Sequence, residues 1–245
     1  MQRRKRGSID GFFSRHRRFL TTSETSAHPD RLDLRHLAIV EEFRDSFEGR
    51  RVVDIASHDG RWSYAALHAG ASAVTGVEIR PDLVAQAEAS LTHFEVDPDR
   101  FRFVTGDAVA GLEEAGECDT VLCLGFLYHT LNYNHLLAGI RATGADHVVV
   151  DTFVGPGDQS VPMVLVVAED VEREGNAAPD DLSTGDRVLV GRPTVAALDV
   201  MFEAHGFRLD RRVDWEALLA AHPEARGIGD YRRGRRVTAR YVRSR

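Results

Sequence analysis

The feature that most constrains the fold is a regular alternation of apolar runs and helical patterns between residues 52 and 151. Runs at 52–55, 73–77, 101–104, 120–124 and 147–151 have the length and composition of buried strands. Helical patterns at 63–70, 81–91 and 133–142 lie between most of them. This order is typical of a parallel, doubly wound α/β sheet, whose ligand site lies beyond the carboxyl ends of the strands.

The remaining segments extend this sheet. A helical pattern at 32–47 precedes it, and strand-like runs at 207–213 and 236–242, with helices at 194–205 and 215–221, bring the predicted sheet to seven strands. Within 155–192, two extended segments (162–168 and 187–190) flank a polar loop, which favours an inserted β lid over a disordered segment. We predict a basic N-terminal arm over 1–31 and one domain over 32–245.

Composition restricts the compartment and the kinds of site. The chain has no stretch of 18 apolar residues and no signal-peptide core after its basic start, so we expect a cytoplasmic protein without a membrane span. Cys118 and Cys123 are five positions apart in one strand-like run and would face opposite sides, which predicts two free, buried thiols. Neither CxxC nor HExxH occurs, and we predict no metal site.

The net charge of −7 is unevenly distributed. Residues 1–20 and residues 230–245 each contain seven basic residues and one Asp, so the rest of the chain is strongly acidic. Two interpretations stay open. The basic ends could attract phosphate, either in RNA or in a phosphorylated metabolite, or they could be solubilising tails.

Acidic residues follow three successive strands at nearly the same point. Asp54 and Glu78 each close an apolar run and are 24 positions apart, close to the spacing of about 20 expected for a ribose-binding carboxylate; Asp107 follows the third run. Each alone is also compatible with a helix N-cap or a solvated acid. Together they predict three carboxylates at one rim of the sheet, which suits the ribose hydroxyls and the amino group of an adenosine ligand.

The turn after the first strand lacks the glycines of a dinucleotide site. A pyrophosphate needs backbone amides exposed by a GxGxxG pattern, whereas the segment Ala56-Ser57-His58-Asp59-Gly60 occupies this turn. The sequence therefore disfavours NAD. It favours a cofactor whose charged end is an amino acid and a sulfonium.

These motifs resemble those of the class I S-adenosylmethionine-dependent methyltransferases over about residues 35–245. Of the three glycines usual in the first motif, only Gly60 remains. The segments Asp59-Gly60-Arg61-Trp62-Ser63 and Gly125-Phe126-Leu127-Tyr128-His129 are similar to those of a subgroup that includes tRNA wobble-uridine methyltransferases and carboxymethyltransferases.

The resemblance implies a set of cofactor contacts. Glu78 would bind the ribose hydroxyls, Asp107 with Ala108 the adenine, and the turn at 54–60 the methionine end, where Ser57 and His58 could replace contacts of the missing glycines. The complete predicted set for S-adenosyl-L-methionine is Asp54, Ala56, Ser57, His58, Asp59, Gly60, Glu78, Ile79, Asp107, Ala108 and Leu124.

His129 and Tyr128 are the predicted catalytic residues. Methyl transfer depends mainly on positioning, but an oxygen or nitrogen acceptor can also require removal of a proton. The ordinary pKa of His129 would suit that task, and Tyr128 would orient the acceptor or contact the sulfonium; both are also compatible with purely structural roles. We expect O- or N-methylation of a small metabolite or glycoside. The alternatives are a tRNA methyltransferase-like enzyme and a non-catalytic S-adenosylmethionine-binding protein.

Overall fold

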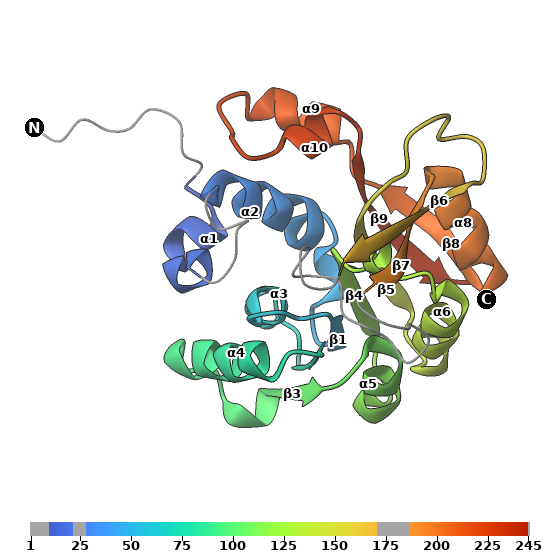
Figure 1. The fold of residues 1–245 in the computed structure, drawn as a ribbon. Coiled ribbons are helices and arrows are strands. Elements are labelled where there is room, and N and C mark those ends of the chain that lie inside the picture. The colour runs from blue at the N-terminus through green and yellow to red at the C-terminus, as the bar shows by residue number, and fades with distance from the viewer. Residues whose placement is uncertain (1–9, 22–27, 171–186, 245) are drawn as a thin grey trace, which may run out of the picture.

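The computed structural model describes residues 10–21, 28–170 and 187–244. Its centre is a seven-stranded sheet of order β3-β2-β1-β4-β5-β9-β8, with helices on both faces (Figure 1). The strands are β1 (Arg51–Ile55), β2 (Ala73–Glu78), β3 (Phe101–Thr105), β4 (Thr120–Leu124), β5 (His147–Phe153), β8 (Phe207–Arg212) and β9 (Arg236–Arg243). Strands β1 to β5 are parallel, and β9 runs antiparallel to β5 and β8. The predicted doubly wound sheet is confirmed.

The helices between the strands include two that the sequence pattern did not reveal. They are α3 (Arg61–His68), α4 (Pro81–His93), α5 (Ala108–Ala115), α6 (Tyr133–Ala142), α8 (Val195–Ala204), α9 (Trp215–Ala221) and α10 (Gly229–Arg232), with short 3-10 turns η5 (Pro98–Arg100) and η6 (Leu127–His129). The unpredicted helices are the four-residue α10 and α5, in which Gly111 weakens the helical pattern. A Cβ at Gly111 would lie 2.2 Å from Val77 Cγ1, so glycine allows α5 to approach the sheet closely.

Both faces of the sheet are buried, which explains why the strand sequences are continuously apolar. Successive residues of a strand point to opposite faces. Val52 and Leu122 therefore pack with the residues of α3, whereas Val53 and Val121 pack with those of α5 and α6. This arrangement leaves the ends of the strands as the place for a ligand.

The N-terminal region is attached to the body by aromatic side chains. It contains α1 (Phe12–Arg15), the 3-10 turn η1 (Arg17–Leu20), α2 (Pro29–His36), the π-helical turn η3 (Leu37–Glu41) and the 3-10 turn η4 (Arg44–Ser46), in place of the single helix predicted over 32–47. Phe12, Phe13 and Phe19 are buried. The Asp33 carboxylate of α2 accepts hydrogen bonds from the backbone N–H groups of Phe13 and Ser14. The described part of the basic arm is therefore docked on the domain.

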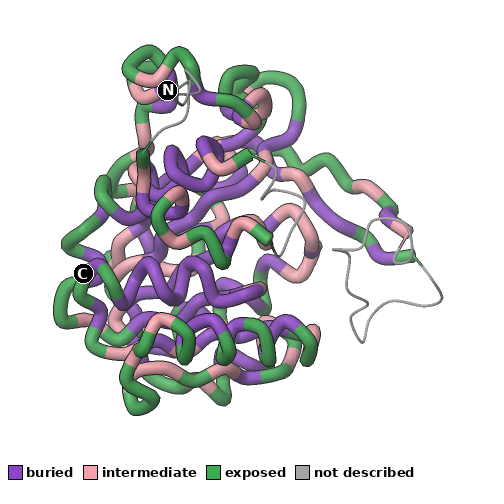
Figure 2. The backbone as a smooth tube through the Cα atoms, turned by 90° about the vertical axis from the view of Figure 1, so that its left-hand side faces the viewer, coloured by how far each residue is buried: buried purple, intermediate pink, exposed green. Residues whose placement is uncertain are grey.

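The strands β6 (Val164–Asp170) and β7 (Arg187–Pro193) form a separate antiparallel hairpin that projects from the body (Figure 2). The two predicted extended segments are therefore confirmed, while the polar loop that joins them lies outside the described residues. Cys118 and Cys123 are free and buried, as predicted. None of the helices in the described ranges combines the length and the apolar composition needed to cross a membrane.

Candidate active site

The turn between β1 and α3 keeps a backbone conformation that normally requires glycine. Ala56 and His58 both have φ of 54°, and Gly60 has φ of 76°. Of the three glycines in the motif that this turn resembles, only Gly60 is present. Left-handed backbone costs a residue with a Cβ roughly 1–2 kcal/mol, and such strain is concentrated at functional sites. The turn has therefore lost two glycines without losing its shape.

Two carboxylates of this turn are buried beneath it. Asp54 is 1% exposed and accepts a hydrogen bond from Ser63 Oγ at 2.8 Å. Burial raises the pKa of Asp54 to about 7, although the Ser63 hydrogen bonds oppose the shift. Asp59 accepts two hydrogen bonds from Arg61, at 2.7 and 2.8 Å. Burial opposes its ionisation, but Arg61 and His58 hold the pKa of Asp59 below its usual range. The hydrogen bonds that both carboxylates accept from α3 therefore stabilise the turn from its buried side.

Glu78 links the first two strand ends. Its Oε2 accepts from the His58 N–H at 3.0 Å, and its Oε1 accepts from the N–H and the Nε of Arg80, at 3.1 and 3.2 Å. A carboxylate offers about four acceptor positions, so displacement of Arg80, whose side chain is 38% exposed, would make room on Glu78 for a ligand hydroxyl.

The adjoining groups match the adenine end of a nucleoside. Ile79 is apolar yet 37% exposed, so it offers a surface for a flat ring. Asp107 is the N-cap of α5, where its Oδ1 accepts from the N–H groups of Val109 and Ala110 at 2.8 and 3.2 Å. The hydrogen bonds to Asp107 from the described residues are all accepted by Oδ1, so Oδ2 can accept from an amino group. Ala108 is half-buried beside it. The hydrogen-bond acceptors and the apolar side chain at this edge therefore match the chemical groups of an adenosine cofactor.

Ser57, one of the predicted cofactor contacts, does not point its side chain toward this edge of the sheet. The Oγ of Ser57 is buried, has no hydrogen-bond partner among the described residues, and would lie 2.8 Å from a Cβ placed on Gly76 of β2. This side chain therefore points toward β2, whereas the His58 side chain is 26% exposed. Of the two, His58 is better placed to meet a ligand.

The second part of the site follows β4. Leu124 ends the strand, and Gly125, with φ of 87°, donates its N–H to the Asp151 carbonyl at 2.7 Å. The next turn, η6, brings the rings of Tyr128 and His129 to a centroid distance of 4.2 Å. Phe153 of β5 meets the Tyr128 ring edge-on at 4.8 Å. The two predicted catalytic residues therefore lie together.

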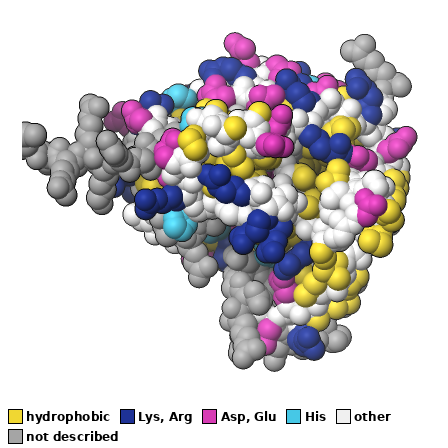
Figure 3. Space-filling view, turned by 90° about the horizontal axis from the view of Figure 1, so that it is seen from above, with side chains coloured by type: hydrophobic (Ala, Val, Ile, Leu, Met, Phe, Trp, Pro, Cys, Tyr) yellow, Lys and Arg dark blue, Asp and Glu magenta, His cyan; other side chains and the backbone are white. Residues whose placement is uncertain are grey.

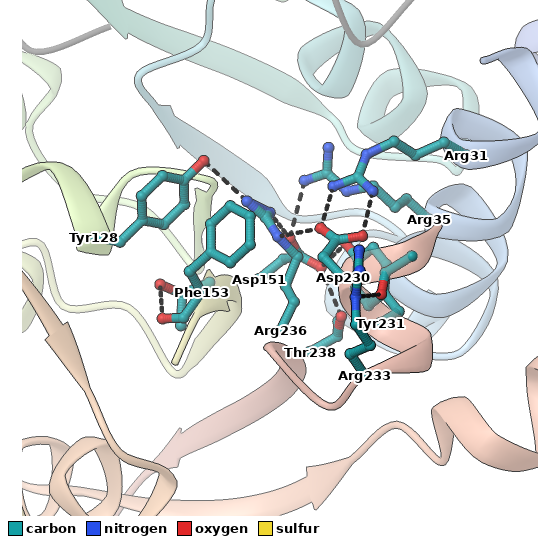
Figure 4. Close-up of polar contacts among 12 residues, drawn as sticks. Arg31, Arg35, Tyr128, Asp151, Phe153, Asp230, Tyr231, Arg233, Arg236 and Thr238 are labelled. Carbon is teal, nitrogen blue, oxygen red and sulfur yellow. Dashed lines mark hydrogen bonds and ion pairs between the residues drawn. The ribbon is translucent and has the colours of Figure 1, made fainter. Parts of the chain in front are cut away.

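An ionic network missed by the sequence analysis holds Tyr128 in place (Figure 4). Arg236 Nη2 donates to Tyr128 Oη at 2.9 Å, and Arg236 Nη1 donates to Asp151 at 2.5 Å. Asp151 also accepts from Arg35, at 3.1 Å, and from Tyr231, at 2.7 Å. Burial opposes its ionisation, but the two arginines lower the pKa of Asp151 to about 2. One signal was present: Asp151 ends an apolar run, as Asp54 and Glu78 do.

The hairpin contacts the other ring of the pair. His129 Nδ1 lies 3.9 Å from Glu169 of β6, and Glu169 lies 3.5 Å from Arg192 of β7. Burial, with Arg236, Arg192 and Arg80 nearby, lowers the pKa of His129 to about 4. The expectation of an ordinary imidazole pKa is therefore not met. The ring is neutral near pH 7 and is a weaker base than predicted.

Part of the basic C-terminal charge is used inside the protein. Arg236 is paired with Asp151, and Arg240 is paired with Asp45 and Asp210. Three further arginines donate to backbone carbonyls: Arg232, Arg233 and Arg243. Arg232, Arg233 and Arg235 are exposed, so the segment combines internal ion pairs with surface charge. No group of three or more His, Cys, Asp or Glu side chains in the described ranges is placed to hold a metal ion.

Comparison with known sequences gives a domain match and several relatives. Residues 52–143 match the model of a family described as a methyltransferase domain. The chain is 32% identical over 171 residues to the tRNA U34 carboxymethyltransferase of Pseudomonas savastanoi pv. phaseolicola, covering 68% of this chain and 48% of the relative. It is 30% identical over 170 residues to that of Pseudomonas aeruginosa. The chain thus spans about half the length of the curated relatives it matches.

Solved structures share the fold at low identity. The magnesium protoporphyrin IX methyltransferase of Synechocystis PCC 6803, with bound SAH, matches with a TM-score of 0.59 and 18% identity over 95% of this chain and 94% of that chain. The N-terminal domain of EvdMO1, with SAH and D-fucose, matches with a TM-score of 0.58 and 19% identity over 84% and 81%. These likenesses concern the fold.

Proposed function

We propose that this chain, which is a class I S-adenosylmethionine-dependent methyltransferase, methylates an oxygen or nitrogen atom of a small metabolite or glycoside in the cytoplasm. The matched domain and the relatives confirm the predicted enzyme class and cofactor, and the solved structures confirm the fold. One observation carries the choice of a small acceptor. The side chain of His129 is only 16% exposed, enclosed between the sheet and the β6–β7 hairpin.

The cofactor would lie along the carboxyl edge of β1, β2 and β3. Glu78 would accept from the ribose hydroxyls, Ile79 and Ala108 would flank the adenine, and Asp107 would accept from its amino group. The left-handed turn at 56–60 would receive the methionine end, next to Leu124. When bound, S-adenosylmethionine supplies an electrophilic methyl group on a sulfonium.

Tyr128 would orient the acceptor. A guanidinium only donates hydrogen bonds, so Tyr128 Oη acts as an acceptor toward Arg236 and keeps its own proton for a second partner. Neutral His129 can offer a further hydrogen bond beside it. With a pKa of about 4, His129 is a weak base, so the chain would accelerate transfer chiefly by orientation.

A tRNA substrate is the second candidate, because the relatives that match this chain are tRNA U34 carboxymethyltransferases. Phosphate recognition would need basic groups that are available at the surface. Arg236 and Arg240 instead have side chains 3% and 8% exposed and are paired with acids. Arg232, Arg233 and Arg235 of the same segment are exposed, so the choice of a small acceptor rests on the enclosure of His129 and not on these pairs.

The experiment that tests the proposal is untargeted mass spectrometry. Purified protein and S-adenosylmethionine would be incubated with a small-molecule extract, with a Tyr128→Phe variant as the control. We expect a compound that gains the mass of one methyl group with the wild type and far less with the variant. Tight cofactor binding without any methylated product in either the small-molecule or the RNA fraction would instead indicate a non-catalytic binding protein.

A further inference from the structure

The β6–β7 hairpin presents an apolar surface to solvent. Figure 3 shows apolar side chains gathered on this projecting part of the molecule. Six side chains of the hairpin and the segment before it are 36–55% exposed: Val161, Met163, Val164, Leu165, Val166 and Leu189. No charged residue occurs from 161 to 168. Proteins usually protect an exposed edge strand with charges, so this surface is expected to have a partner.

The open edge of the hairpin belongs to β6. The outer edge of β7 lies against the body, since Gly191 N–H donates to the Thr130 carbonyl at 3.1 Å and Gly155 N–H donates to the Pro193 carbonyl at 2.9 Å. Because the Gly191 N–H points away from β6, its cross-strand partner Val166 must also direct its N–H and C=O away from β7. Among the described residues, no backbone group from outside the hairpin bonds Val164, Val166 or Ala168 on this outer edge.

We propose that β6 pairs antiparallel, through this edge, with β6 of a second copy of the chain. Antiparallel pairing of two identical strands is self-complementary and gives a closed dimer. With the two-fold axis at Val166, Val164 of each copy faces Ala168 of the other, and every outward N–H between them finds a carbonyl. No charge lies within 164–168, so no like charges meet across the contact.

Pairing at this edge would make the two hairpins one continuous four-stranded sheet. Val164 and Val166 of each copy would then lie beside Ala168 and Val166 of the other, which shields part of their apolar surface. The same hairpin carries Glu169 and Arg192 on its inner side, against His129. Pairing of the outer edges would therefore hold each hairpin over its own site. The proposal itself does not depend on the identity of the acceptor.

The test uses a matched pair of substitutions on the full chain. Val166 in β6 and Val200 in α8 are both 52% exposed, so Val166→Lys and Val200→Lys introduce the same charge at the same exposure. Light scattering after size exclusion, over a range of concentrations, would give the mass. We expect the wild type and Val200→Lys to be dimers, and Val166→Lys to weaken dimerisation at least tenfold. Unchanged circular dichroism would show that each variant folds.

A backbone substitution supplies a second arm. The Val166 N–H faces the open edge, so Val166→Pro keeps the ladder with β7 but removes the central hydrogen bond of the proposed contact. We expect this variant to be monomeric and folded. A monomeric wild type at tens of micromolar, or equal masses for the two Lys variants, would overturn the proposal. So would monomers that bind phosphatidylcholine vesicles through Val166, which would assign the surface to a membrane.

Discussion

Replacing Asp151 by Asn tests the ionic network behind Tyr128. Asn keeps the shape of the side chain but removes the charge that Arg35 and Arg236 face. Removing one partner of a buried ion pair costs about 3–5 kcal/mol, because the remaining charge is left uncompensated. Asp230 lies 3.4 Å from Arg236 and would offset part of this loss, so we expect about 3 kcal/mol.

Urea unfolding at neutral pH measures this change, and a surface ion pair provides the control. Glu42 is paired with Arg211 at 3.1 Å, with both side chains 40% or more exposed. Such pairs contribute about 0–1 kcal/mol, so Glu42→Gln should hardly change the free energy of unfolding. If Asp151→Asn were as mild as Glu42→Gln, the network would not be a significant source of stability.

The stabilisation that Asp151→Asn removes should depend on pH. The pKa of Asp151 is lowered to about 2 from an ordinary 3.8, so its contribution is present above pH 4 and is lost as the pH falls toward 2. The shift corresponds to about 2 kcal/mol. The difference in unfolding free energy between the wild type and Asp151→Asn should therefore narrow over this range. A difference that stays constant from pH 4 to pH 2 would refute the assignment of the shift to Asp151.

Three further predictions follow from the site and its surroundings. Burial, with neighbouring cations, lowers the pKa of His36 from 6.5 to about 4. Because the unfolded chain binds this proton more readily, the free energy of unfolding should fall as the pH drops from 6.5 to 4. His36→Phe should reduce that fall when urea unfolding is compared at pH 7 and pH 5. Glu78→Gln should weaken S-adenosylmethionine binding about tenfold or more in calorimetry, because a charge-assisted hydrogen bond contributes ~1.5–3 kcal/mol, while the exposed Glu88→Gln should not; equal affinities would remove Glu78 from the cofactor site. Ala56→Gly should leave the unfolding temperature unchanged or higher, because it relieves a left-handed residue, whereas Ala85→Gly in the exposed interior of α4 should cost about 1 kcal/mol; a loss at position 56 as large as that at 85 would contradict the strain argument.

The parts of the fold that the sequence predicted were those with local signals. Continuous apolar runs revealed the strands because both faces of the sheet are covered, and the same runs located Asp54 and Glu78 at their ends. The left-handed turn was not accessible in this way. Ala56 and His58 seldom adopt positive φ, so their sequence hides a conformation that the surrounding structure imposes.

Other features depend on contacts between distant segments. Arg236 and Asp151 are 85 positions apart, and no pattern in either segment predicts their pairing. The low pKa of His129 arises from burial and from arginines on separate elements, Arg80, Arg192 and Arg236, so its ordinary pKa was the only expectation that the sequence alone allowed. The sequence therefore proposes the residues of the candidate site, but it does not predict their electrostatics.

The most direct test of the account is the fate of a labelled methyl group. Wild-type protein and Tyr128→Phe would each be incubated with methyl-labelled S-adenosylmethionine and a total extract, and the label would then be counted in the small-molecule fraction and in the tRNA fraction. We predict label in the small-molecule fraction with the wild type and little with Tyr128→Phe. Label in tRNA, or small-molecule label that Tyr128→Phe leaves unchanged, would contradict the enclosed small-acceptor site.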